Sequence, residues 1–393
     1  MIHIKSYQTL CAFGHFCSDI NQSALSAILP FLIAAYHYDY TTAAFLVLAS
    51  NIIGSVVQPI LGQLSDTHNR PWIMPAGLFL AGGGMALTGI ITDFYGLCLA
   101  VMLSGIGIAM FHPQGALLVN RVSTEENRGL SLSIFAFGGN MGFTVGPLLV
   151  TGAVSLFGLP GTLVFFIPEI IICTLIALLY PKIKALGDKK IQKKEGKGTS
   201  SLKPDQWPSF IKLCVTVFGR SIIFYGVNTF VVLYFIHELG QTRALGNSIL
   251  SLYYGIGAIS TLAGGKLADK YGCRTVARLG FCLFFPALLL MTFMTDIYSA
   301  ALFLFITGIA VSLVYSPLVV LGQQYLPNRV GLASGVTLGL SVSIGGIAAP
   351  FLGKVADTFG LPYAFYTICA VSLIPLIFSF LLSEPEKREN IPA

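Results

Sequence analysis

The sequence predicts an all-α polytopic membrane protein with twelve transmembrane helices in two pseudo-symmetric halves of six. Three observations lead to this prediction: an apolar composition, twelve apolar segments of spanning length, and an internal repeat. Hydrophobic residues make up 55% of the chain and charged residues only 10%, whereas a soluble domain has about 25% charged residues. This composition excludes an ordinary soluble enzyme. The long apolar runs exclude an outer-membrane barrel, whose strands alternate polar and apolar residues.

Twelve segments are apolar over the roughly 20 residues that a helix needs to cross a bilayer. They are residues 8–34, 43–64, 72–92, 97–119, 130–156, 162–180, 209–236, 244–266, 275–295, 298–321, 331–355 and 362–382. Turn-forming residues separate them, as at residues 65–71, 158–161 and 327–328. The first run continues well past the apolar region of a cleavable signal peptide, so we expect it to be a span.

Lysine and arginine indicate on which side of the membrane each loop lies, because cytoplasmic loops carry an excess of both. Of the 23 lysines and arginines, 20 lie in or beside the termini and the loops after even-numbered spans, and only Arg243 and Lys354 lie in loops after odd-numbered spans. We therefore expect both termini and the middle loop to be cytoplasmic. Eight lysines gather in that loop, and this placement of the net charge of +6 argues against a nucleic acid partner.

Residues 182–208 form the one long polar segment of the sequence. We interpret it as a cytoplasmic basic linker that lies against an anionic leaflet, with a regulatory binding site as the alternative. It separates an N-terminal half, residues 1–181, from a C-terminal half, residues 209–393. The eight cysteines lie mostly within or beside apolar segments and form no CxxC pair, so we expect neither a disulfide nor a cysteine–metal framework.

Short motifs recur at a constant offset of 203 residues. Residues 62–66 (GQLSD) match residues 265–269 (GKLAD), residues 142–147 (GFTVGP) match residues 345–350 (GGIAAP), and residues 104–106 match residues 307–309. One offset across three helices predicts parallel repeats related by an axis along the membrane normal. This architecture suits a transporter that rocks around a site near the midplane.

Each half carries a glycine–acid–arginine loop between its second and third spans: Gly62-x-x-x-Asp66-x-x-x-Arg70 and Gly265-x-x-x-Asp269-x-x-Gly272-x-Arg274. These loops resemble the signature motif of the major facilitator superfamily, and the glycine-rich fifth span ending at Gly146-Pro147 resembles its antiporter motif. Further segments resemble the fosmidomycin-resistance branch of its drug exporters: Gly14-His15 with Asp19 and Gln22-Ser23, Gln58-Pro59, Pro71-Trp72 with Pro75, Phe111-His112-Pro113, Gly138-Gly139-Asn140-x-Gly142 and Leu326-Pro327-x-Arg329-x-Gly331. The resemblance implies a major facilitator fold and proton-coupled antiport that exports a small anionic drug or metabolite across a bacterial cytoplasmic (inner) membrane.

Two positions depart from the resembled pattern. Gln114 follows His-Pro in the fourth span, where the branch has an acid. The fourth span also lacks the membrane-embedded arginine of the common proton-antiporter motif, and Arg121 lies near its cytoplasmic end instead. The coupling mechanism therefore does not transfer directly from the resemblance.

Polar residues form one stripe along the first span, because His15, Asp19 and Gln22 recur at helical spacing. Asp19 lies roughly 17 Å into the span at about 1.5 Å per residue, near the bilayer centre. An ionisable residue there is a functional hypothesis by default. We predict that Asp19 carries the coupling proton together with His15, the alternative being a structural acid hydrogen-bonded to a helix.

His112 and Glu169 are the other two proton-coupling candidates. In the resembled superfamily the first and fourth spans line one cavity, so His112 is expected to approach His15 and Asp19. We expect no metal site there, because no tight ligand spacing such as HxxxH supports one. Glu169 beside Pro168 either takes part in coupling or is a buried, hydrogen-bonded acid.

Arg220 in the seventh span is the predicted anchor for an anionic substrate. Its planar fork of donors suits phosphonate, phosphate or carboxylate, and Asn228 follows two turns later on the same face. The alternative is an internal ion pair with Asp19 or Glu169. Further polar residues expected to face the cavity and the substrate are Gln22, Asn51, Gln58, Gln114, Asn140, Tyr254 and Tyr315.

Four charged residues at cytoplasmic helix ends are expected to gate the cavity. They can cap helices and pair across the halves, which would hold the outward-open state. These residues are Asp66, Arg70, Asp269 and Arg274.

The sequence therefore predicts a secondary active transporter that works as a monomer by alternating access, and not an enzyme. No GxxxxGK[ST] loop is present to use ATP, and we expect no cofactor. Other cargo, such as a metallophore, siderophore or sugar phosphate, remains open, as do import and a receptor that has lost transport.

Overall fold

The computed structural model describes residues 4–67, 70–123, 128–194 and 204–384, and this part of the chain contains helices and no strand. The first half comprises α1 (Ile4–Tyr36), α2 (Tyr40–Thr67), α3 (Ile73–Leu87), α4 (Phe94–Val122), α5 (Arg128–Phe157), the 3₁₀ segment η1 (Leu159–Phe165) and α6 (Phe166–Lys194). The second comprises α7 (Trp207–His237), α8 (Arg243–Tyr271), α9 (Cys273–Phe293), α10 (Ile297–Leu313), α11 (Tyr315–Tyr325), α12 (Val330–Ser334), the π-helical segment η2 (Gly335–Leu340), α13 (Ser341–Phe359) and α14 (Leu361–Leu381).

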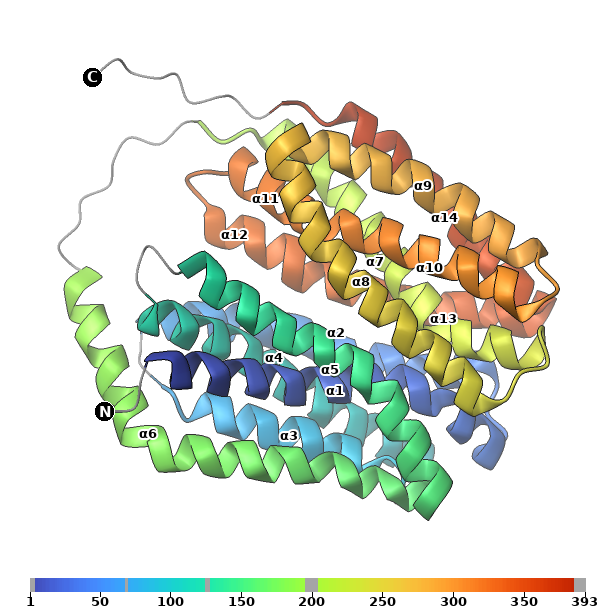
Figure 1. The fold of residues 1–393 in the computed structure, drawn as a ribbon, viewed down its shortest axis with the longest axis horizontal. Coiled ribbons are helices and arrows are strands. Elements are labelled where there is room, and N and C mark those ends of the chain that lie inside the picture. The colour runs from blue at the N-terminus through green and yellow to red at the C-terminus, as the bar shows by residue number, and fades with distance from the viewer. Residues whose placement is uncertain (1–3, 68–69, 124–127, 195–203, 385–393) are drawn as a thin grey trace.

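The helices form two bundles that lie against each other, one from each half of the chain (Figure 1). Each of the twelve predicted spans corresponds to one helix or to consecutive helical segments. In the described ranges, nine helical stretches are long and apolar enough to cross a membrane, and α2 and α3 supply shorter apolar stretches. The predicted all-α, two-half fold class is confirmed.

The structure differs from the prediction in the first part of the linker, residues 182–194. Helix α6 continues past Pro181 to Lys194, so the first part of the segment expected to be a linker is helical. Lysine is a good helix former, and a proline bends a helix without always ending it. Residues 195–203 of the predicted linker lie outside the described residues.

The tenth span is broken at Val314, which separates α10 from α11. Pro317 lies in the first turn of α11, a position that tolerates a missing N–H, whereas a continuous helix through Pro317 would lose a backbone hydrogen bond. Carbonyls in the last turn of α10 therefore lack their usual helical partners. Both segments contact α7, so the break opens toward the centre of the protein.

Glycines allow α5 to lie directly against α1. A Cβ atom on Gly138 would collide with the carbonyl of Ala12, and one on Gly142 with the carbonyl of Phe16. Gly345 of α13 makes the corresponding close approach to Ser221 of α7. Close backbone packing of this kind stabilises helix pairs in a bilayer, where little hydrophobic force acts between helices.

The two halves are joined at the end of the bundle away from the first residue of α1 and the last residue of α6. The N–H groups of Tyr40 and Thr41, in the first turn of α2, donate to the carboxylate of Asp357, in the last turn of α13, at 2.8 and 2.9 Å. Asn247 of α8 donates to the carbonyl of Ala27 at 3.2 Å and to Thr151 at 3.0 Å. These bonds hold the two halves together at that end.

Candidate functional site

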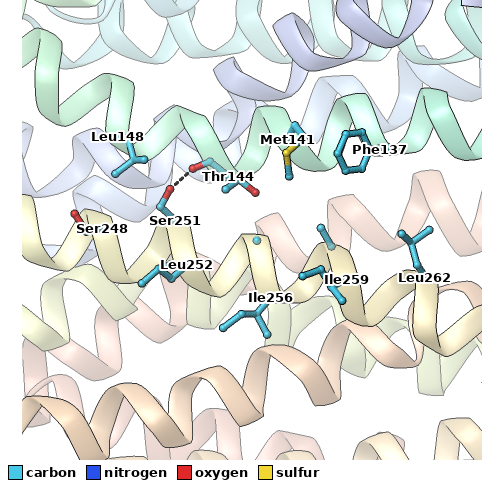
Figure 2. Close-up of a pocket in the computed structure, with 12 residues that line it drawn as sticks. Phe137, Met141, Thr144, Leu148, Ser248, Ser251, Leu252, Ile256, Ile259 and Leu262 are labelled. Carbon is cyan, nitrogen blue, oxygen red and sulfur yellow. Dashed lines mark hydrogen bonds between the residues drawn. The ribbon is translucent and has the colours of Figure 1, made fainter. Parts of the chain in front are cut away.

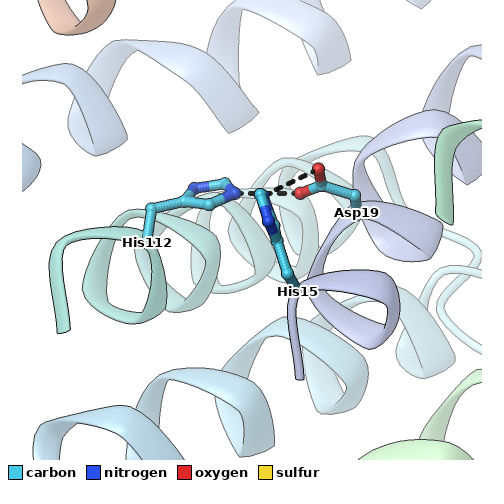
Figure 3. Close-up of side chains that lie close together, drawn as sticks. All are labelled: His15, Asp19 and His112. Atoms are coloured by element: carbon cyan, nitrogen blue, oxygen red, sulfur yellow. Dashed lines mark hydrogen bonds and ion pairs between the residues drawn. The ribbon is translucent and has the colours of Figure 1, made fainter. Parts of the chain in front are cut away.

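The midpoint of α1 carries a cluster of three titratable side chains (Figure 3). Nε2 of His15 lies 3.2 Å from one carboxylate oxygen of Asp19, one helical turn away, and Nε2 of His112 on α4 lies 2.9 Å from the other oxygen. Asp19 is buried, at 4% exposed. The structure thus brings together His15, Asp19 and His112, as the position of the fourth span implied.

The hydrogen bonds of His15 determine how many protons the cluster holds. Nδ1 of His15 lies 2.8 Å from the backbone carbonyl of Phe135, which can only accept, so Nδ1 carries a hydrogen. Neutral histidine then has no hydrogen on Nε2, and the contact between Nε2 and Asp19 needs one more proton, on either partner. The contact with His112 needs no further proton, because neutral His112 can donate from Nε2. Hydrogen bonds at both contacts would require one proton more than a carboxylate with two neutral imidazoles supplies.

Helix α5 supplies the wall behind this cluster. The ring of Phe135 stacks on the ring of His15, with centroids 4.1 Å apart. A Cβ atom on Gly139 would lie 2.6 Å from Nε2 of His15 and 2.5 Å from a carboxylate oxygen of Asp19. Phe135 and Gly139 were not predicted as site residues, although Gly139 belongs to a segment that resembled the exporter branch.

The cluster has donor atoms of the kinds that bind transition metals, all within 4.8 Å of one another. In the described geometry both Nε2 atoms and both carboxylate oxygens are engaged with each other. The same three side chains can also share a proton.

The second half carries an arginine at a similar depth. Arg220 lies near the middle of α7, and its Nε donates to the carbonyl of Val311, at 2.9 Å, in the broken last turn of α10. Its guanidinium lies 4.7 Å from the ring centroid of Tyr315, the first residue of α11, and 5.5 Å from that of Phe224. Among the described residues, no carboxylate lies within 4.0 Å of it, so neither alternative ion pair, with Asp19 or with Glu169, is present in this conformation.

Gln22 and Tyr225 connect the two halves at the centre. Nε2 of Gln22, three residues after Asp19 on α1, donates to the hydroxyl of Tyr225 on α7 at 3.3 Å. The two residues are 203 positions apart, close to the 205 that relate Gly14 of α1 to Gly219 of α7. Nearly equivalent positions of two repeats can touch only close to the axis that relates them, so the bond lies near the pseudo-two-fold axis.

Glu169 is placed apart from the cluster. Its Oε1 accepts from Nδ2 of Asn21 at 2.5 Å, and its Oε2 is buried without a hydrogen-bond partner in the described part of the chain. Asn21 lies two residues after Asp19, on the other side of α1. Glu169 therefore faces the packing between α1, α3 and α6, where a Cβ atom on Gly82 would collide with it.

The remaining predicted substrate residues have varied surroundings. Asn51 bonds to the carbonyl of Val47 and faces Gly346 of α13, and the ring of Tyr254 packs on that of Phe143 across the halves. Asn228 is buried, and its side-chain oxygen has no partner among the described residues. Gln114 is buried and Asn140 partly buried, whereas the side chain of Gln58 lies outside the described residues.

The predicted gating residues do not pair across the halves in the described ranges. Arg274 forms an ion pair with Glu384 of its own half, at 3.1 Å. Arg70 and Asp269 are exposed. The side chain of Asp66 lies outside the described residues.

A pocket of about 640 Å³ lies between α5 and α8, separate from these polar groups (Figure 2). The hydrogen bond from Ser251 to the carbonyl of Thr144 crosses the seam between the halves at this pocket. The other side chains around it are almost all apolar and include Phe137, Met141, Leu148, Leu252, Ile256, Ile259 and Leu262. Several of them are exposed on the outside of the bundle, where a bilayer would cover them.

Comparison with known families identifies the protein family of this chain. The sequence model of the Major Facilitator Superfamily matches residues 11–350 and 213–393. The chain belongs to the Major Facilitator Superfamily. As a member, it is a multi-pass membrane transporter of small molecules and not an enzyme.

Two relatives within the superfamily align over nearly the whole chain. The fosmidomycin resistance protein of Escherichia coli is 25% identical, covering 96% of this chain and 92% of its own. The uncharacterized MFS-type transporter YfnC of Bacillus subtilis is 26% identical, covering 97% and 94%.

Solved structures agree on the fold. A bacterial homologue of the human lysosomal transporter Spinster, in an inward-facing and unoccupied conformation, superposes with a TM-score of 0.81 at 16% identity, covering 97% of both chains. The xylose transporter XylE of E. coli, in an inward open conformation, gives a TM-score of 0.75 at 16% identity over 98% of both chains.

Proposed function

We propose that this superfamily member is a proton-coupled antiporter that exports a small anionic compound by alternating access. The observation that carries the proposal is the pairing of two unlike sites near the middle of equivalent helices. A cluster that can share a proton is centred on α1, and an arginine without a carboxylate partner in the described chain lies on α7. Ionisable groups at membrane depth commonly mark ion and substrate pathways.

The proton is carried by Asp19 together with His15 and His112. In this proposal the cluster releases its proton when water reaches it from one side of the membrane and regains a proton from the other side. Histidine changes its charge near neutral pH, and the carboxylate gives the proton a second place to bind. Glu169 has no part in this proposal, because it lies on the other side of α1.

The anion is captured by Arg220. The bond from Nε to Val311 fixes the guanidinium, and in the described part of the chain no hydrogen bond engages its two terminal NH₂ groups. These two groups form the parallel pair of donors that binds an oxyanion. Tyr254, Tyr315, Asn228, Gln22, Asn51, Gln114 and Asn140 complete the surroundings of the cargo in this proposal.

The described conformation suits loading from the cytoplasm. The basic loops predict that the termini are cytoplasmic. The hydrogen bonds that Asp357 accepts and Asn247 donates would then close the outer end. In the outward-facing state we propose that Asp66, Arg70, Asp269 and Arg274 close the opposite end. One chain supplies both sites, which is consistent with a functional monomer.

The name of one relative supports export of a drug. That relative is named for fosmidomycin resistance, and a resistance protein of this superfamily would act in the bacterial inner membrane. Metallophores, siderophores and sugar phosphates are the alternative cargo, because they present carboxylates or phosphates that the same arginine could bind. Gln114, in place of the acid of the resembled branch, leaves this alternative open.

The test is proton efflux from acid-loaded everted vesicles when fosmidomycin is added. We expect efflux with the wild type and little or none with Asp19→Asn. Asp93→Asn is the matched control, because Asp93 caps the exposed start of α4, away from the cluster. Efflux from Asp19→Asn equal to the wild type would exclude Asp19 as the coupling acid, and a silent wild type that is well expressed would exclude fosmidomycin as the cargo.

A further inference from the structure

The surroundings of Arg220 contain a hydroxyl group that the fold does not use. Tyr253 of α8 is almost fully buried, at 1% exposed, and its hydroxyl has no hydrogen-bond partner among the described residues. A buried tyrosine hydroxyl usually has a partner, because an unpaired polar group that has lost its water is costly. This hydroxyl therefore needs an explanation other than stability.

Tyr253 of α8 and Arg220 of α7 both contact helix α10. The ring of Tyr253 packs where Gly308 has no side chain, and a Cβ atom there would lie 2.8 Å from the ring. Val311, one turn later on the same helix, accepts the bond from Nε of Arg220. The two side chains thus pack against adjacent turns of the same helix.

The terminal NH₂ groups of Arg220 and the hydroxyl of Tyr253 both lack a hydrogen-bond acceptor among the described residues. The terminal NH₂ groups of Arg220 can only donate, and the hydroxyl of Tyr253 has a hydrogen to donate whether or not its oxygen accepts one. No described carboxylate lies within 4.0 Å of Arg220 to take these bonds. A group that accepts several hydrogen bonds from different directions would satisfy all of them, and a polyatomic oxyanion is such a group.

We propose that Tyr253 is a substrate-binding residue whose hydroxyl donates a hydrogen bond to the oxyanion that Arg220 holds. This inference rests on the proposed function, in which Arg220 anchors an anionic cargo, and adds a neutral donor in a second direction. Arginine alone attracts any anion, whereas two donors fixed at an angle require an anion with oxygens pointing both ways. The site therefore selects carboxylates, phosphonates or phosphates over halides.

The test separates binding from stability through the single variant Tyr253→Phe. Removing a buried, unpartnered hydroxyl should leave the melting temperature of the purified protein unchanged or higher. It should weaken binding of fosmidomycin, a phosphonate, roughly tenfold or more, because a hydrogen bond to a charged group is lost. Both quantities are measured on the full chain in detergent, by calorimetric titration and by thermal unfolding.

Tyr234→Phe is the matched control. Tyr234 is also a buried tyrosine of the second half, but its hydroxyl bonds to the carbonyl of Thr292 at 3.2 Å, away from Arg220. We expect the opposite pattern for this variant: a lower melting temperature and an unchanged dissociation constant.

Each failure has a separate signature. If Tyr253→Phe binds fosmidomycin like the wild type while Arg220→Gln does not bind it, the inference is wrong and the anion site stands. If Arg220→Gln also binds normally, the proposed function loses its anchor. A wild type that binds neither fosmidomycin nor inorganic phosphate would overturn both.

Discussion

Gly139 shows how one residue can determine whether the proton cluster forms. The position lies on α5, directly against His15 and Asp19, and any side chain would need the space that their functional atoms occupy. The neighbouring Gly138 and Gly142 instead approach the backbone of α1. One short glycine-rich segment therefore serves two purposes, helix packing and room for the cluster.

Gly139→Ala should disrupt coupling while the fold survives. The new methyl group would displace the ends of two side chains, and overpacking of this kind costs about 1–3 kcal/mol. We expect fosmidomycin-driven proton efflux to fall roughly tenfold, which corresponds to about 1.4 kcal/mol. Gly152→Ala, on the same helix with nothing within 4 Å of the added atom, should behave like the wild type. Equal efflux from both variants would refute this role of Gly139.

Glu169→Gln should leave proton coupling intact, in contrast to Asp19→Asn. The amide oxygen of glutamine can still accept from Nδ2 of Asn21, and its NH₂ group can donate to the oxygen of Asn21, which is also buried without a described partner. We therefore expect an unchanged ratio of protons to substrate and an equal or higher melting temperature. Loss of the proton response in vesicles with Glu169→Gln would show that Glu169 takes part in proton coupling.

At the scale of helices, the break between α10 and α11 builds the arginine site. A continuous tenth helix would keep the carbonyl of Val311 in its own hydrogen-bond ladder, and Nε of Arg220 would lose its partner. The restart at Tyr315 also places an aromatic ring over the guanidinium. Irregular backbone at membrane depth is tolerated where it is buried or lines a cavity, and here it serves a buried cation.

The contact between α2 and α13 joins the two halves at the end that we expect to face outward. The carboxylate of Asp357 caps the first turn of α2 from the other half, accepting from the N–H groups of Tyr40 and Thr41 and from the Thr41 hydroxyl. An acid at a helix N-terminus satisfies free N–H groups and complements the helix dipole. Because the bond crosses the halves, it stabilises only the conformation in which this end is closed.

Asp357→Asn should shift the protein toward the state that is open at this end. Loss of the charged cap is worth about 1 kcal/mol, or roughly fivefold in the ratio of the two states. Spin labels at Tyr95 and Tyr298, which are exposed near the starts of α4 and α10, would report longer distances, with the exposed Cys282 replaced. Asp296→Asn, which removes a cap within one half, should leave the distances unchanged, and no change with Asp357→Asn would refute this role of Asp357.

At the scale of the whole molecule, the bond between Gln22 and Tyr225 lies where the proposed rocking movement would be smallest. Points near the axis between two rocking bodies move least, so this bond can persist while the contact between α2 and α13 opens. It also lies between the two proposed sites, one turn from Asp19 along α1. Proton and cargo would thus be handled beside the part of the interface that changes least.

The distribution of basic residues predicts the orientation of the molecule. A fluorescent protein that folds only in the cytoplasm, fused after Ala393, should be bright, and alkaline phosphatase fused there should be inactive. The same reporters after Tyr95, in the first turn of α4, should give the reverse result. If the reporters gave the same result at both positions, the assignment of spans would be wrong.

Much of the fold could be predicted from the sequence because each span satisfies its own backbone within one apolar segment. The same property made polar residues conspicuous: Asp19 and Arg220 were recognisable as site candidates because charge is rare at that depth. The repeat offset then related the two halves. These signals are local or periodic, and they need no knowledge of which helix faces touch.

The sequence by itself determined the number of spans, their division into two halves and the depth of the charged residues. Only the tertiary structure decided which groups meet: His112 with Asp19, Phe135 with His15, Arg220 with Val311, and Asp357 with α2. These partners come from helices distant in sequence, and helices that are apolar on most faces do not reveal by their pattern how they are rotated. Close packing of glycines and carbonyls sets that rotation, and the site follows from it.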